Sequence, residues 1–216
     1  MTAPRRIRRL AERAQQDRAD LDAVLDAALV GTLSTVVDGA PWVVPMLYAR
    51  DDDRILLHGS TGAGALRQVA SGAPAAFSVV HLDGIVVAHT TFDSSANYRS
   101  AVVYGTLHPV ADPEAAREAL RRISDAVLPG RDAELRPTTA RELAATQVMT
   151  LAITDGDWLV KVRTGGAGEP DEPTSAWTGV VPLRMVADEP VPDDRSRDAA
   201  VPDSVRERVR RGGSAV

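Results

Sequence analysis

The sequence contains no cysteine among its 216 residues. Disulfide bonds, thiolate metal sites and cysteine nucleophiles are therefore excluded. A metal site would have to use histidines and carboxylates, but the histidines show no ligand spacing such as i, i+4 on a helix, and no carboxylate cluster accompanies them. The four histidines are His58, His81, His89 and His108. We therefore predict no metal-ligating residues.

Long apolar runs and an excess of positive charge are also missing. The longest apolar runs, such as residues 85–88 and 101–104, are far shorter than the ~20 residues needed to cross a bilayer. Four arginines lie within the first nine residues, but polar residues follow them instead of the apolar core of a signal peptide. The net charge of -5 gives no long-range attraction to polyanions. We expect a cytoplasmic protein that binds neither nucleic acid nor a membrane.

What remains is an ordinary globular composition, with 44% hydrophobic and 25% charged residues. The length suits one large domain or two small ones. No G-x-G-x-x-G motif follows a strand, and strand-helix-strand alternation is missing, so a doubly wound nucleotide-binding domain is disfavoured. Short strands at short intervals instead favour a mainly β fold with flanking helices, closed into a barrel.

Turn residues and apolar periodicity locate the elements. Asp38–Gly39 and Asp83–Gly84 each separate two β-rich runs, which is typical of tight hairpins. Pro113 at a first helical position, with acidic residues in the first turn, suits a helix start. The expected strands are residues 31–37, 42–48, 54–58, 75–81, 85–90, 100–110, 149–154 and 157–162. The expected helices are residues 20–28, 63–69, 113–127 and 139–145.

Composition also suggests the limits of the domain. Residues 1–19 are rich in charged residues and alanine, and we interpret them as an N-terminal arm. Residues 20–185 would form the barrel domain. Residues 186–216 are acidic and then rich in arginine, which is typical of a disordered C-terminal tail.

A first polar cluster begins at His58, where a strand gives way to a helix. Backbone N–H groups and the positive end of a helix dipole favour an anion there, and the hydroxyls of Ser60 and Thr61 add donors. The same residues suit a plain helix cap, and the spacing alone does not separate these two interpretations.

A second cluster follows Asn97. Arg99 can hold a phosphate or carboxylate through its planar fork of donors, and Tyr98 can cover an aromatic ring. Lys161 and Arg163 share one face of a strand because side chains alternate with a period of two. A surface salt bridge and a charged sheet edge are the alternatives for these residues.

Several motifs in one order resemble a known family. Residues 31–35, 44–48, 57–61, 97–100, 103–105, 142–146, 161–165 and 177–182 are similar to the pyridoxamine 5'-phosphate oxidase-like flavin-nucleotide-binding proteins, in the branch related to nitroimidazole-resistance proteins. The resemblance covers about residues 20–185. It implies an FMN-binding split β-barrel that works as a homodimer, with the cofactor in a groove between the subunits.

The resemblance also implies which residues bind the cofactor. The flavin would lie along one strand, its phosphate would be held where the next strand ends, and further donors would come from later strands. The residues implied are Pro45, Met46, Leu47, Tyr48, His58, Gly59, Ser60, Thr61, Tyr98, Arg99, Ser100, Lys161, Arg163 and Trp177.

The sequence departs from the family pattern at two places. Gly64 stands where relatives carry Lys or Arg, and Asp93 begins a segment where they carry His-His-Ser-Met. Arg67, one helical turn after Gly64, is the cation that would replace the missing one at the phosphate.

Three functions fit this sequence. The first is an FMN-dependent oxidoreductase acting on a small molecule, in which the flavin performs the redox chemistry. The second is a non-catalytic carrier or sensor of flavin or another small ligand. The third is a heme protein, with one of the four histidines as axial ligand. FMN is the expected cofactor, with FAD or heme as alternatives.

Overall fold

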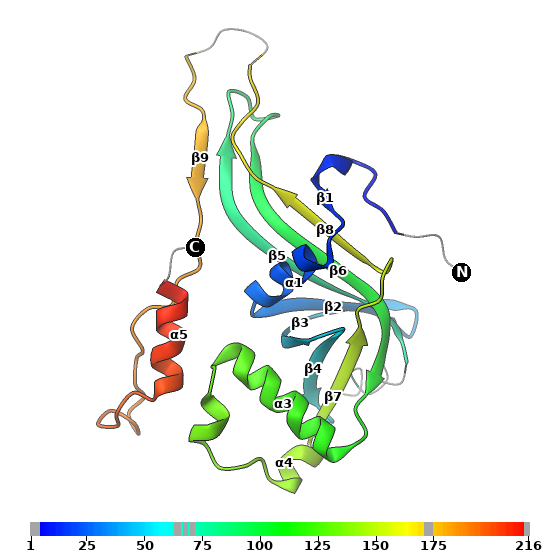
Figure 1. Ribbon diagram of the computed structural model, residues 1–216, viewed down its shortest axis with the longest axis vertical. Helices are drawn as coiled ribbons and strands as arrows, with labels where there is room; N and C mark the ends of the chain where they lie inside the picture. Colours follow the sequence, from blue (N-terminus) through cyan, green and yellow to red (C-terminus); the bar gives the residue numbers. More distant parts are fainter. Residues whose placement is uncertain (1–4, 63–65, 67–68, 70–71, 171–174, 214–216) are drawn as a thin grey trace.

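An antiparallel β-sheet that curls into a barrel is the main element of the described structure (Figure 1). The computed structural model describes residues 5–62, 66, 69, 72–170 and 175–213. The strands are β1 (Ala14–Gln15), β2 (Val30–Val37), β3 (Ala40–Asp51), β4 (Arg54–Ser60), β5 (Pro74–Val87), β6 (Ser95–Pro109), β7 (Thr146–Ala152), β8 (Trp158–Arg163) and β9 (Gly179–Pro182). The helices are η1 (Ala11–Arg13), α1 (Arg18–Ala27), α3 (Pro113–Val127), η2 (Arg131–Glu134), α4 (Ala140–Ala144) and α5 (Asp203–Gly213).

Strand β6 closes the barrel because it pairs with three other strands. It pairs with β5 along most of its length, with β8 at its other edge, and with β7 at its end. The barrel therefore runs from β6 through β7, β4, β3, β2 and β5 back to β6. Strands β1 and β9 extend this sheet at β8 and β5, respectively. The predicted split-barrel architecture is confirmed.

The split itself lies between β3 and β4. Strand β3 pairs with β4 only from Tyr48 to Asp51, and its first half pairs with β2 alone. Strand β4 likewise leaves β3 after Leu57, and His58 continues only beside β7. The two strands therefore diverge past Tyr48 and Leu57 and leave an opening in the barrel wall.

Two apolar clusters stabilise this arrangement. The larger fills the barrel and includes Leu21, Val24 and Leu25, which α1 presents on one face at helical spacing. The smaller lies on the other side of β3 and β4, where α3 packs through Ala116, Ala119 and Ile123. Helix α3 has the predicted bounds, because Asp112 caps it by accepting a hydrogen bond from Ala115 N, and Pro113 occupies the first turn.

Of the two expected hairpins, one is confirmed and one is wrong. Asp38 and Gly39 adopt positive φ angles of 52° and 79° and join β2 to β3. Asp83 and Gly84 instead lie inside β5, where the pairing with β6 shifts register. They form a β-bulge, so the expected strands 75–81 and 85–90 are one strand, and the expected strand 100–110 begins earlier, at Ser95.

The bulge changes which alternate residues of β5 are buried. Before it, Phe77 and Val79 are buried, and after it, Val86 and Ala88 are buried. Gly84 lets β9 approach, because a Cβ atom there would lie 3.0 Å from Val180 Cγ1. The bulge thus lets a long hairpin extend beyond the barrel with β9 along its edge (Figure 1).

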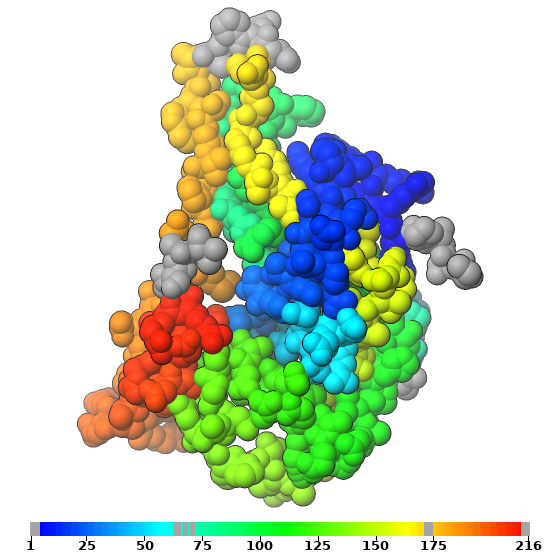
Figure 2. All heavy atoms as spheres, in the orientation of Figure 1, coloured from blue at the N-terminus to red at the C-terminus, as the bar shows by residue number. Residues whose placement is uncertain are grey.

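The C-terminal residues lie along one side of the molecule, in a segment whose composition predicted disorder (Figure 2). Helix α5 lies there, and its Ser204 is 2% exposed. The Ser204 backbone N–H and hydroxyl donate hydrogen bonds to Glu134 Oε1 and Oε2 at 2.9 Å and 2.6 Å. A carboxylate some 70 positions away in the sequence therefore caps the start of α5.

This cap predicts an acid-sensitive attachment of α5. The hydrogen bonds from Ser204 and the ion pair with Arg131 lower the pKa of Glu134 to about 2. The cap is therefore fully formed above the ordinary pKa of a glutamate and is lost as the pH falls toward 2. We expect Glu134→Gln to increase amide hydrogen exchange in α5 at pH 7, while α3 stays protected. Equal protection of α5 in both proteins would contradict the cap.

Two predictions concern helices that would span a membrane or follow β4. Among the residues described, no helix is long and apolar enough to cross a membrane. The predicted helix at 63–69 lies mostly outside the described residues, as do Gly64 and Arg67.

Candidate functional site

The opening between β3 and β4 forms a hollow of about 330 Å³. It is where the structure brings together part of the predicted site, since Pro45, Met46 and Leu47 line it together with His58. Apart from His58 and Ser60, its described lining is apolar, and none of these side chains is charged. The lining residues are Trp42, Val44, Pro45, Met46, Leu47, His58, Gly59, Ser60 and Leu66.

His58 is the one titratable side chain among the described residues that line this hollow. Its Nδ1 atom is buried and has no hydrogen-bond partner. Burial also lowers the pKa of the His58 imidazole, because a low-dielectric environment disfavours the charged form. His58 therefore has a buried ring nitrogen that the described residues do not bind, in surroundings that disfavour its charged form.

The neighbouring hydroxyls are largely engaged within the chain. The Thr61 backbone N–H and Oγ1 both donate to Ala145 O at 3.1 Å. Ser60 Oγ accepts a hydrogen bond from Gly62 N at 3.1 Å. Thr61 thus joins the end of β4 to the turn before β7, and Ser60 alone keeps a hydroxyl proton that it can donate to a ligand.

Tyr48 does not line the hollow. Its ring is buried inside the barrel, edge to face with Phe77, and its hydroxyl donates to Leu25 O in α1. Burial raises the pKa of Tyr48 well above its ordinary value. The structure therefore shows Tyr48 holding α1 against β3, at the point where the split begins.

Alternation along β6 separates the residues of the second predicted cluster. Arg99 lies on the face opposite to Tyr98 and Ser100 and makes a two-pronged ion pair with Asp83, at 2.8 Å and 3.0 Å. Asp83 is the extra residue of the bulge in β5. Arg99 is therefore engaged in stabilising the bulge.

Tyr98 and Ser100 do come together with the predicted cations. In the antiparallel pairing of β6 with β8, Tyr98 lies opposite Arg163, and Ser100 lies opposite Lys161. Directly opposite residues place their side chains on the same face, within reach of one another. We call these four residues the cationic strip.

The cationic strip keeps its charges near the surface. Lys161 Nζ donates to Arg9 O at 3.2 Å, and Arg163 donates to Asn97 Oδ1 at 2.5 Å. No carboxylate pairs with either cation among the described residues. Two positive charges are therefore available to an anion on this face of the sheet.

The sheet face that carries the cationic strip also carries exposed apolar side chains, with small hydroxyl residues such as Thr32, Ser34 and Ser78 between them. Pairing registers connect the strip on β6 and β8 through β5 and β2 to the outward residues of β3. Large apolar side chains on this face are 43% to 70% exposed. We call it the outer face, and these side chains are Val30, Val43, Leu47, Val80 and Leu82.

Trp177 lies apart from the strip. It precedes β9, which pairs with the far part of β5, and its side chain is 67% exposed. Within one chain, the hollow, the cationic strip and Trp177 are therefore three separate places. Sequence reasoning did not assign Trp42 and Val44 to the site, although their spacing from Met46 by a period of two is a signal that could have done so.

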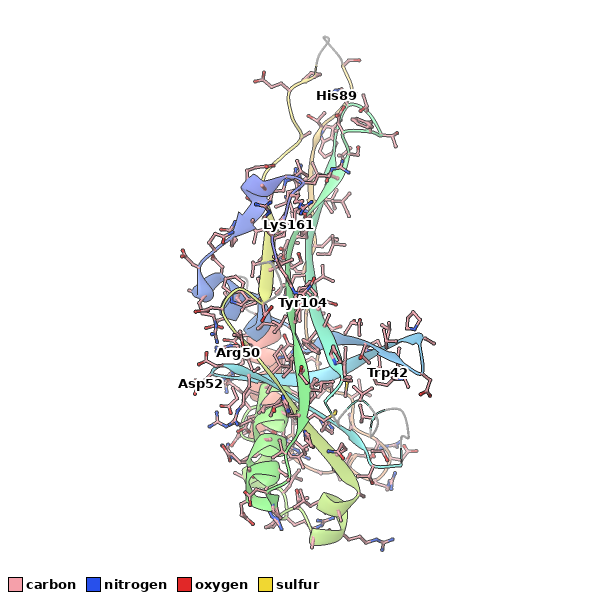
Figure 3. The ribbon with its side chains drawn as sticks, turned by 90° about the vertical axis from the view of Figure 1, so that its right-hand side faces the viewer. Trp42, Arg50, Asp52, His89, Tyr104 and Lys161 are labelled. Atoms are coloured by element: carbon pink, nitrogen blue, oxygen red, sulfur yellow. The ribbon has the colours of Figure 1, made fainter. Side chains whose placement is uncertain are left out.

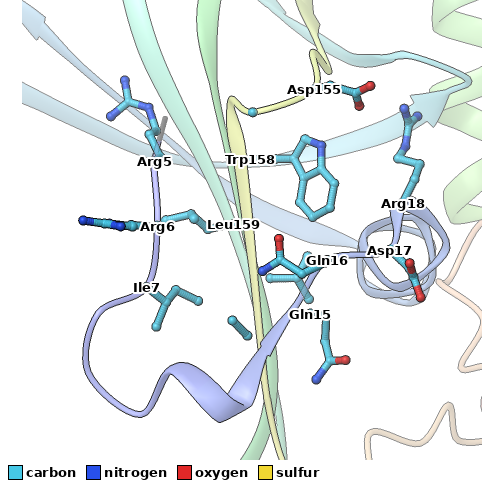
Figure 4. Close-up of a pocket in the computed structure, with 13 residues that line it drawn as sticks. Arg5, Arg6, Ile7, Gln15, Gln16, Asp17, Arg18, Asp155, Trp158 and Leu159 are labelled. Carbon is cyan, nitrogen blue, oxygen red and sulfur yellow. The ribbon is translucent and has the colours of Figure 1, made fainter. Parts of the chain in front are cut away.

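A second cavity of about 480 Å³ lies between the N-terminal arm and the edge of β8 (Figure 4). Its lining mixes charges of both signs, and the main cations are paired: Arg5 with Asp157, and Arg18 with Asp22. Trp158 Nε1 is buried there without a partner. None of the predicted site residues lines this cavity.

Comparisons with known proteins agree with this architecture. A sequence model of the pyridoxamine 5'-phosphate oxidase family matches residues 17–157, which is more than half of the chain. The chain belongs to this family. No curated protein sequence matches it.

Two solved structures are similar over most of their length. The FAD and heme binding protein from Mycobacterium smegmatis is 41% identical, with a TM-score of 0.87 over 91% of this chain and 97% of that chain. The flavocytochrome Anf3 from Azotobacter vinelandii is 31% identical, with a TM-score of 0.86 over 93% of this chain and 94% of that chain. A candidate 5-nitroimidazole antibiotic resistance protein from Bacteroides thetaiotaomicron shares the fold at 18% identity, with a TM-score of 0.58 over 69% of this chain and 86% of that chain.

Proposed function

We propose that this protein is a homodimer that binds a flavin nucleotide, FMN or FAD, and uses it for redox chemistry on a small molecule. The observation that carries the proposal is the outer face, which combines exposed apolar side chains with the cations Lys161 and Arg163. Membership of the pyridoxamine 5'-phosphate oxidase family and the flavin-binding relatives support the same function.

The outer face is also the basis for proposing a dimer. Five large apolar side chains on one face form the kind of exposed patch that marks a protein interface. Within one chain the cationic strip on β6 and β8 and the outward side chains of β3 are separated by β5 and β2. Packing two copies through their outer faces would bring the strip of one copy against Pro45 and Leu47 on the outer face of the other.

In this dimer the chain's own residues would bind and orient the flavin. Lys161 and Arg163 would neutralise its phosphate, and Ser100 and Tyr98 would add hydroxyl donors. Pro45 and Leu47 would present the apolar edge of β3 to the ring system. The bound flavin supplies the redox chemistry, so none of these residues has to act as an acid or base.

Two other functions remain testable alternatives. A non-catalytic flavin carrier would bind the cofactor equally well but would not turn over a nicotinamide donor. Heme binding is a second candidate function, favoured by the apolar hollow around His58. The names of both similar structures, an FAD and heme binding protein and a flavocytochrome, support it.

The test is to record the visible spectrum of the purified protein before and after incubation with FMN and FAD, followed by gel filtration with light scattering. We expect flavin absorbance bands that stay with a dimeric protein. Bleaching of these bands by NADH or NADPH without oxygen, and their return when an electron acceptor is added, would favour the enzyme over the carrier. A monomer that retains no flavin would contradict the proposal.

A further inference from the structure

We propose that His58 is the axial ligand of a heme bound in the split between β3 and β4. The inference rests on the heme-binding function proposed above and assigns it to a site separate from the cationic strip. It differs from the expectation that residues 58–61 hold the flavin phosphate. The structure gives three reasons for this assignment.

First, the described lining of the hollow suits a porphyrin. Trp42, Val44, Met46 and Leu66 line it, and none of its described lining residues is charged. A phosphate needs cations or free N–H donors, whereas a porphyrin ring needs an apolar slot. The N–H and hydroxyl of Thr61, which would serve a phosphate, are already bonded to Ala145 O.

Second, His58 has the properties of an iron ligand. An iron ligand needs a ring nitrogen that reaches the metal, and the His58 side chain lines the hollow. Its buried Nδ1 has no hydrogen-bond partner among the described residues, which is costly unless a further group binds the ring. Strand β4, which is paired with β7 at Val148, holds the backbone of His58 rigidly at the edge of the hollow.

Third, the other histidines are unsuitable. His81 Nε2 lies 3.1 Å from Val24 O and joins β5 to α1. His108 is exposed on β6 and lines none of the cavities described above. His89 Nδ1 is also buried without a partner among the described residues, but its Nε2 lies 3.4 Å from Asp93, at the far end of the long hairpin and well away from Trp42 in the hollow (Figure 3).

The other side-chain types that can bind heme iron also point to His58. The chain has no cysteine, and the Tyr48 hydroxyl is bonded to Leu25 O inside the barrel. Met46 lines the hollow together with His58, so its thioether is the one other soft donor at this place. We therefore expect His58 to provide the essential ligand.

The experiment titrates hemin into the full-length protein and follows the Soret band, with FMN fluorescence quenching measured in parallel. Replacing His58 by Ala should weaken hemin binding at least about 10-fold, because even partners outside the ligand set change metal affinity by 10- to 100-fold. The Soret maximum should shift as well. Millimolar imidazole should restore it in His58→Gly by replacing the lost ring.

Matched controls separate this proposal from the flavin function. His89→Ala and His108→Ala should bind hemin as the parent protein does, and His58→Ala should keep its FMN affinity within about twofold. His58→Gln, with circular dichroism on every variant, guards against a folding defect. The proposal is overturned if the parent protein gives no Soret band, if His58→Ala and His58→Gln keep it, or if His58→Ala loses FMN instead of hemin.

Discussion

Replacing Lys161 and Arg163 together by glutamine should weaken flavin binding by about 100-fold. Each charge-assisted hydrogen bond contributes roughly 1.5 to 3 kcal/mol, and about 1.4 kcal/mol corresponds to a factor of ten. Both side chains lie on the outer face, beside Tyr98 and Ser100 of the neighbouring strand β6. No described carboxylate neutralises them. Titration of FMN fluorescence against protein concentration measures the effect.

The matched control is Arg8→Gln, an exposed cation of the N-terminal arm. It changes the net charge but removes no member of the cationic strip, so we expect less than about a twofold change. The difference between the two variants should shrink at high salt, because ions screen exposed charges. Unchanged FMN affinity in the double variant would show that the strip does not bind the phosphate.

A second large effect is expected inside the barrel, at Gly31. A Cβ atom there would lie 2.1 Å from Phe77 Cζ, and Phe77 is fully buried against Tyr48. The ring has no room to move in a close-packed core, so Gly31→Ala should lower the free energy of unfolding by about 3 kcal/mol. Urea unfolding followed by circular dichroism measures this loss.

A double-mutant cycle tests the cause of that loss. In a Phe77→Leu background the ring is gone, so adding Gly31→Ala should cost less than about 1 kcal/mol more. Gly166→Ala is the control, because no atom lies within 4 Å of a Cβ there. An equal cost of Gly31→Ala with and without the Phe77 ring would mean that the contact is not responsible.

Local signals predicted the elements that local interactions decide. Helix α3 matches its prediction because Asp112 and Pro113 specify its start from within the sequence. The turn at Asp38 and Gly39 is equally local, because both residues need positive φ. In these places the sequence contains the cause of the structure within a few residues.

Elements that depend on distant partners were predicted less well. Asp83 and Gly84 have the same turn chemistry as the first hairpin, but β6 and β9 pair with β5 along this segment and turn it into a bulge. Helix α5 is capped by Glu134, which no local pattern connects to Ser204. Tertiary contacts decided both cases.

In the candidate site, too, local signals predicted some features and tertiary contacts decided the others. The strand period correctly placed Lys161 and Arg163 on one face, and the family resemblance placed Pro45 near His58. The same period separates Arg99 from Tyr98 and Ser100, which the motif alone had kept together. The apolar character of the hollow emerged only from the divergence of β3 and β4, because that brings Trp42 and Leu66 together.

The most direct test of the central claim is a stoichiometric titration of the purified protein with FMN and with FAD, followed by quenching of flavin fluorescence. The account predicts saturable binding of one flavin per chain, two per dimer, with an affinity that falls by about 100-fold when Lys161 and Arg163 are replaced by glutamine. The absence of saturable quenching with both flavins would contradict it.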